Sequence, residues 1–177
     1  EKEDIVLGID TIQKRSEGLL KFAQVYRNLN KISQPQIKAI PIKELFANTF
    51  NLLNAGFEEQ NIDFDILLKE PNLIIHADPN LLEQTVINLL VNAKDAVLGK
   101  TNGHVELSAQ EENHKMIIKI SDNGKGIPPE IIDRIFIPFY STKPNGSGIG
   151  LSLSKQIMLM HKGNIHVASK EGVGTVF

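Results

Sequence analysis

A short glycine-containing stretch, Ser121–Ile127, constrains the fold of this chain more than any other feature. It follows an apolar run, Met116–Ile120, so the carboxylate of Asp122 falls where a strand is expected to end. Gly124 and Gly126 allow positive φ angles and close approach of the backbone to a ligand. Two interpretations are open here. One is a hairpin turn, which Asp-Asn-Gly favours, and the other is a carboxylate that reads the amine edge of a flat heterocycle.

Three further motifs flank this stretch, and each is weak when taken singly. They are Asn88-Leu-Leu-Val-Asn92-Ala-Lys-Asp95-Ala96 upstream, and Gly146-Ser-Gly148-Ile-Gly150-Leu151 and Gly172-Val-Gly174-Thr175 downstream. The order and spacing of the four motifs resemble the ATP-binding domain of sensor histidine kinases. That domain belongs to the superfamily of DNA gyrase B subunits, MutL and the Hsp90-type chaperones. The resemblance covers about residues 42–177 and implies ATP and Mg²⁺ as ligands.

The composition sets limits on the class of protein. A chain of 177 residues is one domain, or one domain with an extension. Its net charge of −2 does not indicate the basic surface that is typical of nucleic-acid-binding proteins. Without cysteine it has neither disulfides nor thiolate-bound metals, and it contains no apolar run long enough to span a bilayer. We expect a cytoplasmic fragment of a longer protein, and the sequence leaves open whether that parent is membrane-anchored.

The first part of the chain, residues 5–30, is predicted to be one amphipathic helix. Its apolar positions follow the alternating steps of three and four that a coiled-coil seam requires, with Ser16 as a polar exception. These positions are Ile5, Ile9, Ile12, Leu19, Ala23 and Tyr26. The alternative is a helix packed on its own domain. The resemblance implies the second helix of a dimerisation and phosphoacceptor hairpin in residues 1–35, a homodimer, and a catalytic domain in residues 36–177 after a boundary at 33–41.

The remaining pattern alternates helices with strands. We expect helices over 42–59, 78–98, 130–135 and 148–161, and strands over 62–68, 73–76, 105–111, 115–121, 164–169 and 173–177. Core-facing side chains are Leu45, Phe46, Thr49, Leu52, Leu53, Leu82, Val86, Leu89, Leu90, Ala93 and Val97. The predicted fold is an α/β two-layer sandwich with a mixed, mainly antiparallel sheet. The resemblance implies a Bergerat-type ATP-binding fold with the helices on one face.

Asn88 and Asn92 lie four residues apart and share a helix face, which Asp95 extends. Asparagine is a poor helix former, so two on one face indicate a use rather than a structural preference. An amide oxygen is a suitable ligand for Mg²⁺, which keeps several waters and shares substrate phosphates. By resemblance, Asn92 is the magnesium ligand and Asn88 supports the phosphate or metal shell. The alternative is two solvated asparagines.

The nucleobase is expected at Asp122, whose carboxylate accepts a hydrogen bond from the exocyclic amine of adenine. Guanine presents a carbonyl at this edge, so ATP is favoured over GTP. Thr175 resembles the family's threonine that assists adenine binding, and Gly124 and Gly126 complete this part of the site. Ile127, like Ile120, either supplies an apolar wall of the adenine slot or belongs to the core.

The phosphates are expected where a helix begins after a glycine-rich loop. Backbone amides at such a helix start bind anions, and the residues expected to do so are Gly146, Ser147, Gly148, Ile149, Gly150 and Leu151. Residues 138–143 match a lid motif of the NtrB-like subgroup of these kinases, with Phe136 and Phe139 expected to anchor the lid. Lys143 is either a charge that reaches the terminal phosphates or a solvated surface lysine.

Three functions compete. The first is a kinase domain that transfers the γ-phosphoryl group of ATP to a histidine outside this chain and works with a response regulator receiver domain. The others are an ATPase of the gyrase or MutL type and a nucleotide sensor without catalysis. The ATPase branches place a glutamate base at the position of Asn88, which cannot accept a proton. None of the five histidines has zinc-site spacing or a phosphoacceptor context, so we expect them to be solvated or structural.

Overall fold

The computed structural model describes residues 35–143 and 146–177, together with isolated helical positions between residues 8 and 23. Most of the predicted N-terminal helix therefore lies outside the described residues, and the division at residue 35 stays a prediction. Of its expected seam, Ile9, Ile12 and Ala23 are described, and all three are exposed. Among the described helices, none is both long enough and apolar enough to span a bilayer.

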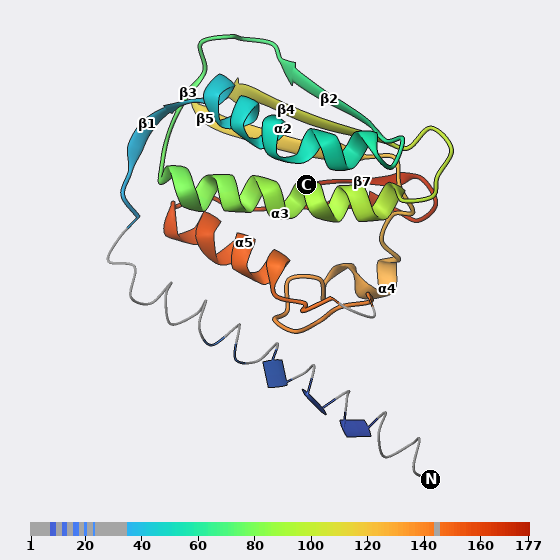
Figure 1. Cartoon of the computed structure of the whole chain (residues 1–177). Helices are drawn as coiled ribbons and strands as arrows, with labels where there is room; N and C mark the ends of the chain where they lie inside the picture. The colour runs from blue at the N-terminus through green and yellow to red at the C-terminus, as the bar shows by residue number, and fades with distance from the viewer. Residues whose placement is uncertain are drawn as a thin grey trace.

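A five-stranded sheet with the order β2-β4-β5-β7-β6 forms one layer of the domain (Figure 1). Only β2 and β4 run parallel, and the other neighbours are antiparallel, so the sheet is mixed. The strands are β2 (Asp63–Leu68), β4 (His104–Glu112), β5 (Lys115–Asp122), β6 (Ala168–Lys170) and β7 (Gly174–Val176). Asn113 and His114 join β4 to β5 with φ angles of 51° and 59°, as a tight primed hairpin turn requires.

Three helices cover one face of this sheet and form the second layer (Figure 1). They are α2 (Ile42–Glu58), α3 (Pro79–Val97) and α5 (Gly150–Met160), and a single short turn, α4 (Pro129–Ile132), precedes the lid region. The two-layer α/β prediction is confirmed. Within β4, the alternating residues Val105, Leu107 and Ala109 are buried against the helices, as the period of two along a strand predicts.

The buried faces of α2 and α3 form most of the core. All six predicted positions of the α3 stripe are buried, and Phe57 of α2 stacks on Phe64 of β2 with ring centroids 4.6 Å apart. Leu45, Phe46 and Thr49 are buried as predicted, and Leu53 is partly buried against the core. The prediction for Leu52 was wrong, because its side chain is 63% exposed. At about 100° per residue, Leu52 lies at the edge of the stripe that Phe46, Thr49 and Phe57 define.

A separate two-stranded sheet contains a strand at Lys38–Pro41 that was not predicted from the sequence, although the predicted catalytic domain, residues 36–177, includes it. β1 (Lys38–Pro41) pairs antiparallel with β3 (Ile74–Ala77), so this segment belongs to the folded domain. The pairing joins residues more than 30 positions apart in the sequence, and local patterns do not register such contacts. The predicted strand at 164–169 is also shortened, because β6 begins only at Ala168.

Asp78 caps α3 and ties it to distant segments. Its Oδ1 accepts hydrogen bonds from the backbone N–H groups of Asn80 (3.1 Å) and Leu81 (3.2 Å), and its Oδ2 accepts one from Gln36 (3.0 Å). The Asp78 N–H donates to Nε2 of His161 at the end of α5, and Nδ1 of His161 lies 2.8 Å from the Ile157 oxygen. Of the two alternatives predicted for the histidines, solvated or structural, His161 is therefore structural.

We expect Asp78→Ala to lower the free energy of unfolding by about 1–2 kcal/mol, because the α3 cap is lost. The measurement is urea denaturation followed by circular dichroism. Asp78→Asn keeps one acceptor oxygen and serves as the matched control, with a smaller loss. Equal stability of the wild type and the alanine variant would contradict a capping role.

Candidate nucleotide-binding site

Asp122 is the last residue of β5, as its position after an apolar run predicted. Its Oδ1 accepts a hydrogen bond of 2.8 Å from the Gly124 N–H, so the carboxylate is held by its own turn. Burial raises the pKa of Asp122, while backbone hydrogen bonds from Gly124 and Thr175 and the charge of Lys100 lower it in part. A half-buried, oriented carboxylate of this kind is suited to accept a hydrogen bond from a neutral amine.

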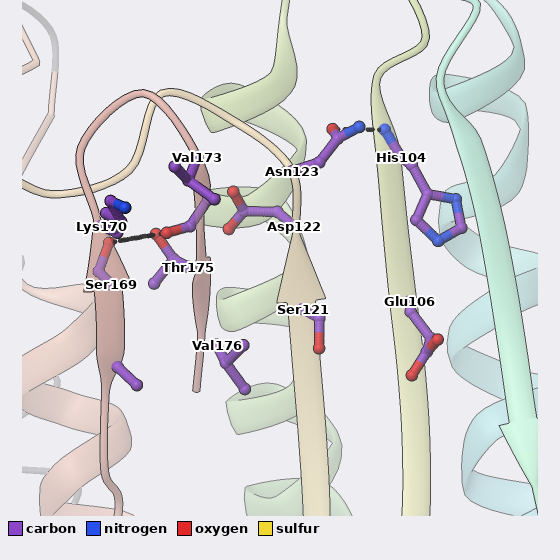
Figure 2. A pocket seen from close by; sticks show the side chains of 12 residues that line it. His104, Glu106, Ser121, Asp122, Asn123, Ser169, Lys170, Val173, Thr175 and Val176 are labelled. Atoms are coloured by element: carbon purple, nitrogen blue, oxygen red, sulfur yellow. Dashed lines mark hydrogen bonds between the residues drawn. The ribbon is translucent and has the colours of Figure 1, made fainter.

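Thr175 lies beside Asp122, because the two residues are partners in the β5–β7 ladder. Its side chain is 3% exposed, and its Oγ1 lies 2.9 Å from Oγ of Ser169 (Figure 2). Ser169 in turn accepts a 2.8 Å hydrogen bond from the Ile127 N–H and lies 3.0 Å from the Gly174 oxygen. The hydroxyl groups of Ser169 and Thr175 therefore fix the position of Thr175 relative to the loop after Asp122. Ser169 was not among the residues predicted from the sequence.

The glycines after Asp122 are required by close packing rather than by a vacant binding space. A Cβ at Gly124 would lie 2.5 Å from the Ala96 oxygen, and a Cβ at Gly126, with φ +70°, would lie 2.2 Å from the Lys170 oxygen. The Lys125 N–H donates to the Ala96 oxygen (3.0 Å), and the Gly172 N–H donates to the Lys125 oxygen (2.7 Å). The loop is therefore clamped between the last turn of α3 and the β6–β7 turn.

The two isoleucines near Asp122 have different environments. Ile120 is 2% exposed and belongs to the core cluster, so the core interpretation holds for it. Ile127 is half-buried outside that cluster.

Asn88 is a half-buried residue of α3 that faces the first residues of α5. Its Nδ2 donates a hydrogen bond of 2.8 Å to Oγ of Ser154, which is 1% exposed. A Cβ at Gly150 would lie 2.2 Å from Oδ1 of Asn88, so any larger residue at the first position of α5 would displace this amide. Asn88 is thus not a solvated asparagine, and its contacts fix the N-terminus of α5 against the middle of α3.

Asn92 and Asp95, one turn further along α3, share a single positively charged partner. Nζ of Lys143 lies 2.9 Å from Oδ1 of Asn92 and 2.7 Å from Oδ2 of Asp95. The side chains of Lys143 and Asp95 are 37% and 39% exposed. Lys143 is therefore partly exposed and ion-paired, and it joins the lid region to the polar face of α3.

The segment before Lys143 contacts both Phe177 and the loop before α5. Phe136 packs edge-on against Phe177, with ring centroids 6.5 Å apart. Phe139 is 43% exposed and its N–H donates to the Gly148 oxygen (2.9 Å), and its role in anchoring the lid stays a prediction. Gly148 has φ +66°, and a Cβ there would lie 2.5 Å from the carbonyl carbon of Phe139.

The predicted phosphate-binding stretch leads into α5. The helix has no side-chain cap hydrogen bond at Ile149, its N-cap, so the first amides of α5 keep their capacity to bind an anion. Gly146 and Ser147 are exposed, whereas Ile149 is buried and Leu151 packs partly on the core. Exposure therefore decreases along this loop toward the start of α5.

The cavity at the end of β5 has a volume of about 510 Å³ and is lined by Asp122 and Thr175. Its other lining residues include Glu106 and Ser121, and Glu106 alternates with the buried residues of β4 (Figure 2). This cavity therefore opens on the sheet face away from the helices, and its lining includes neither the asparagines of α3 nor residues 146–151. The residues predicted to bind the metal and the phosphates therefore lie outside this cavity.

His104 has neighbours that sequence spacing did not predict. Its Nδ1 lies 3.4 Å from Oδ2 of Asp63, and Asp65 lies on the same strand two residues further. The three side chains place ligand atoms within 4.8 Å of one another, because β2 and β4 pair in parallel with Asp63 opposite His104. Both aspartates are exposed on the edge strand β2, and His104 lies half-buried on the neighbouring strand β4.

The fold and these side chains define an ATP-binding domain with its polar site beside one helix and one strand end. Residues 77–177 match the family described as histidine kinase-, DNA gyrase B- and HSP90-like ATPases, and the chain belongs to that family. It is 32% identical over 93% of its length to the sensor histidine kinase ZraS of Salmonella typhi. It is 33% identical over 96% of its length to the histidine kinase AtoS of Escherichia coli K12.

These relatives are longer proteins. The chain spans 35% of ZraS and 26% of AtoS. Among solved structures, it is similar to the catalytic domain of the histidine kinase ThkA, with a TM-score of 0.73 and 30% identity. That match covers 80% of this chain and 92% of the ThkA domain. The chain therefore corresponds to the ATP-binding catalytic domain of sensor histidine kinases.

Proposed function

We propose that this domain binds ATP together with Mg²⁺ and transfers the γ-phosphoryl group to a histidine on a dimerisation hairpin of the same protein. The observation that carries the proposal is the arrangement of polar residues along one face of α3. Asn88 contacts the start of α5, Asn92 and Asp95 contact Lys143, and Ala96 holds the loop after Asp122. One helix thus connects the residues expected at the base, the metal and the phosphates.

The donor set of α3 fits magnesium. Asn92 offers an amide oxygen and Asp95 a carboxylate oxygen, which are the oxygen ligands that Mg²⁺ takes in proteins. In this structure the two oxygens already surround one positive charge, the ammonium group of Lys143. Asn92 would hold the ion, and when bound the ion neutralises charge on the phosphates.

The protein's own contribution to the reaction is positioning. In phosphoryl transfer there is little covalent chemistry for the protein to perform, and catalysis depends on orientation and electrostatic stabilisation. Asp122 and Thr175 orient the adenine, and the first amides of α5 hold the phosphates. Lys143 offsets the negative charge of the γ-phosphate of ATP. Asn88 keeps α5 in place through Ser154 and supplies no base for water, which favours transfer over hydrolysis.

The partners follow from the same assignment. The acceptor histidine would lie on a hairpin whose second helix is predicted in residues 1–35, and this helix would form the homodimer. A response regulator receiver domain would take the phosphoryl group from the histidine. The net charge of −2 gives no indication of nucleic acid as a partner.

We expect the isolated chain to bind ATP but neither to label itself nor to hydrolyse ATP appreciably. Incubation with γ-labelled ATP, alone and with a separately produced hairpin carrying the histidine, tests this. Acid-labile label on the hairpin is the expected result, and a covalently tethered hairpin should react faster because transfer becomes unimolecular. Steady phosphate release by the chain alone would instead support an ATPase. An absence of chemistry with either form of the hairpin would support a nucleotide sensor.

A further inference from the structure

The contact between Lys143 and α3 places a charged side chain on the proposed metal ligands. The ammonium nitrogen lies 2.9 Å from Oδ1 of Asn92 and 2.7 Å from Oδ2 of Asp95, within hydrogen-bond range of both. The backbone of Lys143 is fixed on both sides as well. Its N–H donates to Oγ of Ser141 (3.1 Å), and its oxygen accepts from the Gly146 N–H (3.1 Å). The lysine is therefore held in place by its turn and not only by its charge.

An ammonium group and a divalent cation cannot occupy these two oxygens together. Mg²⁺ requires oxygen ligands at about 2.0–2.1 Å, and the positive charges of the ion and of Lys143 repel each other at such short range. A free metal ion that enters this site must displace Lys143 and leave the ammonium group without its acceptors. A metal ion that arrives on a nucleoside triphosphate brings phosphate oxygens that can accept the displaced ammonium group.

We propose that Lys143 makes the Asn92–Asp95 site selective for metal that enters with nucleotide. Without nucleotide, the ammonium group occupies both oxygens and neutralises Asp95. With metal and nucleotide, the ion takes the oxygens and Lys143 moves to the terminal phosphates. The site thereby exchanges one cation for another, and the charge near Asp95 stays balanced in both states. This inference rests on the proposed function, because it takes Asn92 as the metal ligand.

The test is the affinity of the nucleotide-free chain for Mn²⁺, a paramagnetic substitute for Mg²⁺, with free ion measured by electron paramagnetic resonance. We expect Lys143→Met to bind Mn²⁺ about fivefold more tightly than the wild type, which is the upper range for a partly exposed ion pair. Lys115→Met is the matched control, since Lys115 is an exposed lysine at the opposite end of β5 from Asp122, and its affinity should equal that of the wild type.

A second variant shows whether the ion occupies the proposed site. Adding Asp95→Asn to Lys143→Met removes the carboxylate and should return Mn²⁺ affinity to the wild-type level or below. The inference is overturned if Lys143→Met binds Mn²⁺ no more tightly than the wild type. It is also overturned if Lys115→Met gains as much, because the effect would then be one of net charge.

A parallel titration separates this inference from the proposed function. ATP affinity of the wild type and of Asn92→Ala is measured with and without Mg²⁺. If Mg²⁺ strengthens ATP binding in the wild type alone, the metal assignment stands, and only the Lys143→Met result decides the inference. If Mg²⁺ has no effect on the wild type, the metal role in the proposed function is wrong, whatever Lys143→Met shows.

Discussion

Replacement of Asp122 by alanine is expected to weaken ATP binding by about 10- to 150-fold. The carboxylate is the acceptor proposed for the exocyclic amine of adenine, and a hydrogen bond to a charged group contributes about 1.5–3 kcal/mol. GTP should bind much more weakly than ATP to the wild type, because its carbonyl would face the same carboxylate. Isothermal titration of both nucleotides into the wild type and the variant measures these affinities.

The structure also predicts how stable Asp122 variants will be. Burial raises the pKa of Asp122, so the ionised form is disfavoured in the folded state relative to the unfolded chain. This destabilising contribution is present above the raised folded-state pKa and disappears as the pH falls below the ordinary pKa of an aspartate. Asp122→Asn removes the charge and can keep the Gly124 hydrogen bond, so at neutral pH its melting temperature should not fall below that of the wild type.

Two results would contradict the adenine assignment. One is equal affinity of the wild type for ATP and GTP, and the other is unchanged ATP affinity in a folded Asp122→Ala protein. Asp133→Ala is the matched control, because Asp133 is an exposed aspartate that follows α4. It should bind ATP as the wild type does.

Asn92→Ala should slow phosphoryl transfer to the hairpin by about 100-fold or more, since a catalytic metal ion stabilises transferring phosphates by several kcal/mol. Binding of ATP without metal should change much less, because the amide is proposed to contact the ion and not the base. The measurements are single-turnover labelling of the hairpin at saturating Mg²⁺ and nucleotide titration in EDTA.

Asn51→Ala controls for the general effect of this substitution in a helix, since Asn51 is an exposed asparagine on α2. Its transfer rate should equal that of the wild type. If Asn92→Ala transfers phosphate at the wild-type rate, then Asn92 serves only to hold Lys143. Circular dichroism of both variants establishes that α3 and α2 remain folded.

The sequence by itself determined the elements whose signals are local. The spacing of three polar residues predicted that Asn88, Asn92 and Asp95 share one face of a helix. The apolar run before Asp122 predicted a strand that ends there and is followed by a glycine-containing loop. These predictions succeeded because helix periodicity and turn chemistry act within about ten residues. The buried stripe of α3 and the β4–β5 hairpin were predictable for the same reason.

Only the tertiary structure decided which distant side chains meet. Lys143 is 48 residues from Asp95 and Ser154 is 66 from Asn88, and neither contact has a sequence pattern of its own. The same holds for the pairing of β1 with β3 and for Ser169, which orients Thr175. Such contacts depend on how the layers pack, and packing is set by the whole core and not by any one segment. The sequence therefore fixes the residue types at the site, whereas the folded chain decides that a lysine occupies the proposed metal ligands.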